Sequence, residues 1–181
     1  MTLKELTSEK HGLAENTLFM KSVFDKTLPK KLWMDYTYQK YIWYREIELA
    51  ASAHGLLDNL PGLARSQLIM NDYQEMAKQD PLTVIEYKKS SIDYASYIRT
   101  LNDPKRILAH LYTWHMGDLF GGQMIKKIVN APHSSLEFSN APEIMKHLRA
   151  LLSNDLAEEA NKAFDWAIQI LQEYNHDLAS N

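Results

Sequence analysis

Apolar residues recur every three to four positions along most of the chain, which is the spacing of one face of an α-helix. No segment alternates between apolar and polar residues as a half-buried strand would. Only six glycines and six prolines interrupt the 181 residues. We therefore predict an all-α fold of about seven or eight helices, with residues 1–181 forming a single domain.

Local start and stop signals place the expected helices. Thr2 and Glu5 have the spacing of a capping box for a first short helix, and Pro104 follows Asn102-Asp103 at a first helical position. Further helices are expected over residues 15–25, 29–54, 63–78, 81–101, 104–130, 142–152 and 156–174, with a polar loop over 131–140.

Composition narrows the classes of function. The net charge of −3 argues against the broad basic surface of a nucleic-acid binder. The absence of cysteine excludes disulfides, thiolate nucleophiles, iron–sulfur ligation and thiolate ligation of iron. The first residues lack the apolar run of a signal peptide, and no stretch approaches about 18 apolar residues. We expect a cytoplasmic protein with no nucleic-acid or membrane partner.

Three glycines stand inside the predicted helix that follows Pro104. Gly117, Gly121 and Gly122 each cost about 1 kcal/mol relative to alanine in a helix, so about 3 kcal/mol of helix propensity is lost. Close packing of two helices would explain such small residues. Asp118 is unusual on a packing face because burying a carboxylate is costly, and successive glycines favour a kink. The pattern fits a flat ligand lying against bare backbone beside one acid.

The run YTWHMGDLFGGQMIKKI resembles the distal helix of heme oxygenases, in which a YxGDLSGGQ-type motif lies across heme. The resemblance implies heme contact for Gly117, Gly121 and Gly122. It implies catalytic roles for Gly117, Asp118 and Gly121. Asp118 would organise water beside the reacting oxygen. The sequence departs from the family pattern at Trp114 and Phe120, where many members have Arg and Ser.

The run LTSEKHGLAENTLFMKSVF resembles the proximal helix of the same family, with its KEVHxxAEN pattern. The resemblance implies that His11 is the axial ligand of the heme iron, and that Ala14 and Met20 line the proximal face. Glu15 lies one helical turn after His11 and can accept its second ring N–H, which is how metal-bound histidines are commonly oriented.

The resemblance also implies contacts around the heme edge. Four residues match positions that hold the heme propionates: Lys4, Tyr112, Lys146 and Arg149. Phe164 matches an aromatic heme contact on the last helix, and Tyr41 matches a tyrosine of the distal water network. The expected fold is thus a helical bundle with heme between a proximal and a distal helix.

The activity implied is oxygen-dependent cleavage of heme b, as both substrate and cofactor, to biliverdin IXα, carbon monoxide and ferrous iron. Electrons would come from reduced ferredoxin, and a bilin reductase is a possible downstream partner. Since ferredoxins are acidic, docking needs a local basic patch. Five lysines are candidates for it: Lys26, Lys30, Lys31, Lys126 and Lys127.

Several alternative functions compete with this interpretation. A non-catalytic heme carrier or sensor would keep the pocket but would have no need of Asp118. A thiaminase-like hydrolase needs a cysteine, and a di-iron bundle needs paired Glu-x-x-His motifs, of which only Glu173 and His176 form one. His110 and His115 flank the distal motif, and we interpret them as structural because oxygen must bind on the glycine side.

Overall fold

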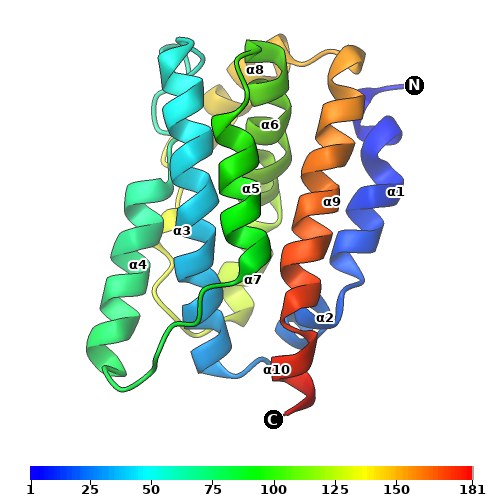
Figure 1. The fold of residues 1–181 in the computed structure, drawn as a ribbon. Coiled ribbons are helices and arrows are strands. Elements are labelled where there is room, and N and C mark those ends of the chain that lie inside the picture. The colour runs from blue at the N-terminus through cyan, green and yellow to red at the C-terminus, as the bar shows by residue number, and fades with distance from the viewer. Residues whose placement is uncertain (181) are drawn as a thin grey trace.

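The computed structural model describes residues 1–180, which form helices and 3₁₀ turns with no strand among them. The longer helices are α1 (Leu3–Glu15), α3 (Lys30–Ala53), α4 (Ser66–Gln79), α5 (Lys89–Arg99), α6 (Pro104–Phe120), α8 (Ala141–Leu151) and α9 (Ala157–Glu173). The short elements are α2 (Leu18–Phe24), α7 (Gly122–Ile128), α10 (Asn175–Ala179) and the turns η1 (Ser134–Leu136) and η2 (Asn154–Leu156). The all-α prediction is confirmed (Figure 1).

Helix α3 organises the interior, because it packs against α4, α5 and α6. Its residues Trp43, Tyr44 and Ile47 are fully buried. The Trp43 ring lies 4.9 Å from the ring of Trp114 on α6. Aromatic side chains bury large apolar areas, so these contacts account for much of the stabilisation of the core.

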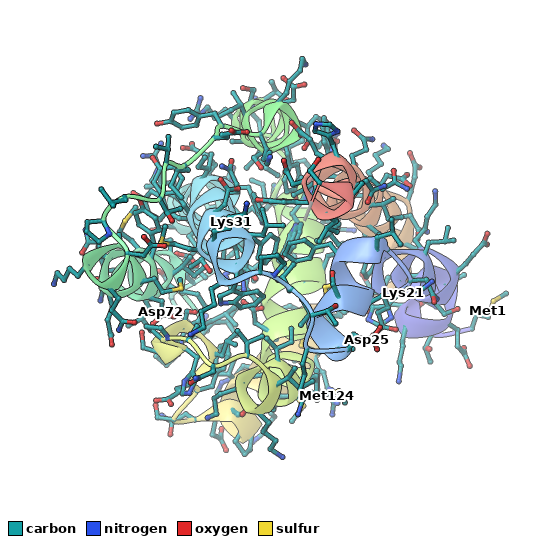
Figure 2. All side chains as sticks on the ribbon, turned by 90° about the horizontal axis from the view of Figure 1, so that it is seen from below. Met1, Lys21, Asp25, Lys31, Asp72 and Met124 are labelled. Atoms are coloured by element: carbon teal, nitrogen blue, oxygen red, sulfur yellow. The ribbon has the colours of Figure 1, made fainter. Side chains whose placement is uncertain are left out.

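Helix α9 supports the second half of the bundle. It packs against α1, α5 and α6, and stands between α1 and α5 in Figure 1. Lys10 Nζ on α1 donates to Asp165 Oδ1 on α9 at 2.5 Å. At the lower end of the molecule α2 packs against α7, and Figure 2 shows the two side by side, with Asp25 beside α2 and Met124 on α7. The N-terminal helices α1 and α2 are thereby connected to α6 and α7, through α9 and through the α2–α7 contact.

Two helices begin at carboxylates that come from distant parts of the chain. Glu48 on α3 accepts the backbone N–H groups of Arg65, at 2.5 Å, and Ser66, at 3.2 Å, where α4 begins. Glu173 on α9 accepts those of Lys89 and Ser90, at 2.8 and 2.9 Å, where α5 begins. The first N–H groups of a helix lack partners within it, and an anion there is favourable. Tertiary contacts therefore determine where α4 and α5 begin.

The predicted start of a helix at Pro81 is wrong, because α5 begins only at Lys89. The intervening segment is held by α3: Gln39 Nε2 donates to the Glu86 carbonyl at 2.7 Å, and Gln39 Oε1 accepts from the Lys88 N–H at 3.2 Å. These contacts satisfy backbone groups that a helix would otherwise have paired.

Two local predictions are confirmed. Thr2 and Glu5 form the reciprocal capping box, with hydrogen bonds of 2.6 and 3.3 Å. The helix after Pro104 is not continuous, because α6 ends at Phe120 and α7 resumes at Gly122. The interruption falls at the glycine pair where a kink was expected.

A buried hydrogen-bond chain ties α5, α6 and α9 together. Trp114 Nε1 donates to the Tyr94 hydroxyl at 2.8 Å, which lies 2.7 Å from His110 Nδ1. His110 Nε2 lies 3.1 Å from Glu159 Oε1, so a neutral ring accepts from Tyr94 and donates to Glu159. Burial lowers the pKa of His110. Burial opposes ionisation of Glu159, but hydrogen bonds from His110 and Arg106 outweigh it, so its pKa lies well below the ordinary value.

These shifts predict loss of stability in acid. Below the ordinary histidine value of 6.5 the unfolded chain takes up a proton that folded His110 does not, and below 4.5 the same holds for Glu159. Glu159→Gln should lower the unfolding free energy at pH 7 by about 2 kcal/mol, because it weakens hydrogen bonds to a charged acceptor. It should also flatten the loss of stability below pH 4.5. Thermal unfolding followed by circular dichroism from pH 7 to pH 3 measures both effects, and wild-type stability in the variant at pH 7 would contradict this account.

Candidate functional site

Asp118 on α6 is buried, with 8% of its surface exposed, and is held from α3. Lys40 Nζ donates to its carboxylate oxygens at 2.7 and 2.8 Å, and the Tyr44 hydroxyl donates to Oδ2 at 2.7 Å. Burial, and then the charge of Asp118, raise the pKa of Tyr44 well above its ordinary value. The hydroxyl therefore remains a donor, and three hydrogen bonds fix the carboxylate.

The tyrosine that contacts Asp118 is Tyr44, and the role expected for Tyr41 in the distal water network stays a prediction. Tyr41 follows Lys40 directly and so lies about 100° around α3 from it, whereas Tyr44 is one turn further on and shares its face. The Tyr41 ring instead lies 5.7 Å from the guanidinium of Arg45. Sequence reasoning missed Lys40 and Tyr44, although a lysine four residues after Tyr36 and four before Tyr44 on an aromatic face was a usable signal.

The glycines of α6 and α7 differ in what surrounds them. Gly117 and Gly121 are exposed, and a Cβ atom built on Gly117 would meet no neighbouring atom within 4 Å. Gly122 is buried, and a Cβ there would lie 3.0 Å from Leu136 Cδ2. Close packing therefore explains Gly122 but not Gly117, whose bare backbone is accessible to a flat ligand.

Apolar side chains border this open backbone. Phe120 directly precedes Gly121 and Met124 follows it by three residues, and the two are 49% and 57% exposed. The Arg149 guanidinium lies 5.8 Å from the Phe120 ring, so α8 brings a cation to the distal segment. An apolar surface with a cation at its edge suits a planar ligand that carries carboxylates.

The histidine predicted as a ligand is accessible. The His11 side chain on α1 is 53% exposed, and its Nδ1 lies 3.5 Å from Glu15 Oε2. Its ring meets the buried Phe164 ring of α9 edge-on at 5.6 Å. Because Glu15 lies beside Nδ1, Nε2 is the ring nitrogen left for a ligand.

The other residues predicted to contact heme differ in how exposed they are. Ala14 is buried, Met20 and Tyr112 are half-buried, and Lys4 and Lys146 are exposed on α1 and α8. Their roles toward heme stay predictions. His110 and His115 are both fully buried and lie against carboxylates, His115 Nε2 at 2.9 Å from Glu48, in keeping with a structural role.

Two cavities adjoin one another, and the smaller one reaches Asp118. The smaller, about 50 Å³, is lined by Asp118 and Lys40 together with Asp72 and His133. The larger, about 410 Å³, opens among three exposed lysines: Lys26, Lys30 and Lys31. Trp33 and Pro132 line both cavities.

The fold is that of solved heme oxygenases. Heme oxygenase-1 of the cyanobacterium Synechocystis, solved in complex with heme, superposes with a TM-score of 0.84 at 22% identity, covering 98% of this chain and 92% of that one. Heme oxygenase of Leptospira interrogans superposes with a TM-score of 0.80 at 24% identity, covering 96% and 100%.

The sequence then identifies the family. The profile described as heme oxygenase matches residues 1–149, so the chain belongs to the heme oxygenase family. It is 28% identical to heme oxygenase 2 of Rattus norvegicus over 94% of this chain and 64% of the rat protein. It is 31% identical to the heme oxygenase of Porphyra purpurea over 70% of this chain and 56% of that one. The chain thus spans less than two thirds of these relatives. Across the described residues, none of the helices has the length and apolar character needed to cross a membrane.

The contrast between the glycines can be tested by substitution. Gly117→Leu should raise the stability of the heme-free protein by about 1 kcal/mol through helix propensity, because a Cβ atom at this position meets no neighbouring atom within 4 Å. It should weaken heme binding at least about tenfold by covering the backbone. Gly122→Leu is the matched control and should destabilise the protein through its clash with Leu136. Thermal unfolding and titration with heme measure the two effects, and undiminished heme binding by Gly117→Leu would exclude this face as the ligand site.

Proposed function

We propose that the chain cleaves heme to biliverdin, carbon monoxide and ferrous iron, with dioxygen and electrons from reduced ferredoxin. The observation that carries the proposal is the buried, hydrogen-bonded acid Asp118 next to the open backbone of Gly117. Heme oxygenase-2 of Synechocystis, which superposes with a TM-score of 0.85 at 22% identity, was solved with heme and nitric oxide.

His11 fits the role of axial ligand. Its side chain is accessible, and Glu15 can accept from Nδ1 and so orient the ring. Phe164 limits its rotation by edge-on contact. Bound heme supplies the iron and the oxygen chemistry, while the protein fixes the geometry around it. A neutral imidazole, unlike a thiolate, gives little push toward cleavage of the O–O bond.

Asp118 fits the role of the group that manages protons on the other face. Its carboxylate oxygens can accept from water and return a proton through that water to the reacting oxygen. The exposed Gly117 backbone carries no side chain, so the ligand can lie against it within reach of this acid. A carrier or sensor would bind heme without needing a buried acid, whose desolvation is costly.

The basic surface proposed for ferredoxin docking also has support. Lys26, Lys30 and Lys31 lie together at the larger cavity, whereas Lys126 lies 3.7 Å from Glu137. A cluster of exposed lysines complements an acidic electron donor and would speed its approach.

Turnover with heme decides between an oxygenase and a carrier. The protein is loaded with heme and given ferredoxin, its reductase and NADPH, and the heme and bilin absorbance bands are followed. Loss of the Soret band with a rising bilin band supports the oxygenase, and an intact heme spectrum without bilin supports the carrier. Chromatography of the product tests the expected IXα isomer.

His11→Ala should abolish bilin formation and change the absorbance spectrum of the heme complex, because the iron loses its protein ligand. The control is His147→Ala, which removes an exposed histidine of α8. A His11→Ala complex with the wild-type spectrum would place the ligand elsewhere.

Asp118→Asn should keep heme binding but slow bilin formation by about 100-fold or more, the usual effect of removing an acid–base group. Asp35→Asn is the matched control, since Asp35 is a buried acid of α3 that accepts from Tyr174 at 2.6 Å instead. Single-turnover absorbance measurements compare the two variants. A normal bilin yield from Asp118→Asn would remove this residue from the reaction.

A further inference from the structure

Lys40 is an unusual residue for the interior of a helical protein. It is only 8% exposed and lies on the buried face of α3 between Tyr36 and Tyr44. Lysine is almost never fully buried unless paired, because removing an ammonium group from water is costly. Both carboxylate oxygens of Asp118 lie within 2.8 Å of Lys40 Nζ, and the ammonium is 4.9 Å from the centre of the Tyr44 ring.

The cation for Asp118 thus comes from α3 and not from the helix of the acid itself. Trp114, one turn before Asp118 on α6, is uncharged and donates its Nε1 hydrogen to Tyr94. Other charged or titratable groups lie farther from the pair. Tyr36 and Arg65 interact electrostatically with Asp118, and Asp72 and His133 line the adjoining cavity. Of these groups, Lys40 is the cation that bonds the carboxylate directly.

The hydrogen bonds leave one position open on each partner. A carboxylate offers about four acceptor positions, and Lys40 and Tyr44 use three of them on Asp118. An ammonium has three N–H donors, and Lys40 donates two of them to Asp118. Both residues line the cavity of about 50 Å³. One water occupies about 30 Å³ in the liquid, so the cavity has room for one beside Lys40 and Asp118.

We propose that Lys40 is a positioning residue. It fixes the orientation of the Asp118 carboxylate, and the two side chains together bind a water in the smaller cavity. The use of that water in the reaction rests on the proposed function. The pair itself exists in the heme-free protein and can be measured there. Without Lys40, Asp118 would be a buried carboxylate with only a neutral donor.

The first experiment is a double-mutant cycle on the heme-free protein, with Lys40→Met, Asp118→Asn and both together. Lys40→Met should lower the melting temperature at pH 7 by about 6 °C or more, as expected for an unpaired buried charge in a chain of this size. In the double variant the loss should be clearly smaller than the sum of the two single losses.

The matched control is Lys88→Met. Lys88 is also a buried lysine, but its ammonium lies 2.7 Å from Asp177. Its effect on the melting temperature should add to that of Asp118→Asn. If the Lys40 and Asp118 losses are additive as well, the proposed pairing is overturned.

The second experiment uses the ferric heme complex. The absorbance of each complex is titrated against pH, and the midpoint of the spectral change is compared. In Lys40→Met this midpoint should rise by at least about half a pH unit, because loss of a neighbouring positive charge disfavours the deprotonated form. It should stay at the wild-type value in Lys88→Met, and Lys40→Arg, which keeps the positive charge, should lie closer to the wild-type midpoint than Lys40→Met does. An unchanged midpoint in Lys40→Met overturns the water role. If the wild-type complex forms no bilin, the proposed function fails, whereas the heme-free cycle still decides the pairing.

Discussion

A buried ion pair between two helices, Lys40 of α3 with Asp118 of α6, is the constraint around which the site is arranged. A carboxylate inside a helical core is stable only when a cation and further donors replace its water. Lys40 and Tyr44 meet that need from one face of α3. The acid therefore stays where the two helices pack, directly after Gly117 in the chain, and its position follows from the packing of the core.

Helix α3 has the same organising effect on the surrounding segments. Its Glu48 accepts the first N–H groups of α4, and its Gln39 holds the segment before α5. The apolar side chains of this helix build the core, and its polar side chains decide where neighbouring helices begin. A change in the register of α3 would thus disturb the helix boundaries and the distal acid together.

The accuracy of prediction from the sequence depended on how local each signal was. The capping box of Thr2 and Glu5 and the interruption at Gly121 involve residues close in sequence, and both are confirmed. The start of α5 was misplaced because the side chain that holds the preceding segment, Gln39, is far away in the chain. Lys40 was overlooked since lysine is usually a surface residue, and its burial follows only from Asp118, 78 positions later.

The same limit applies to the aromatic residues of α3. Tyr41 and Tyr44 lie close together in a helix rich in tyrosine, and the resemblance singled out Tyr41 but not Tyr44, which contacts Asp118. The choice depends on which face turns toward α6, and that is settled by tertiary packing. On the proximal side, the proximity of His11 and Glu15 followed from a one-turn spacing and needed no such information.

The open backbone at Gly117 also bears on the lifetime of the protein. A glycine kept where a side chain would fit leaves the heme-free fold less stable than it could be, by about 1 kcal/mol. Any ligand that binds the folded state there raises its stability by mass action. Proteases act on the unfolded fraction, so such a gain changes protein abundance severalfold. If heme binds this face as proposed, Gly117 links the amount of protein to the supply of its ligand.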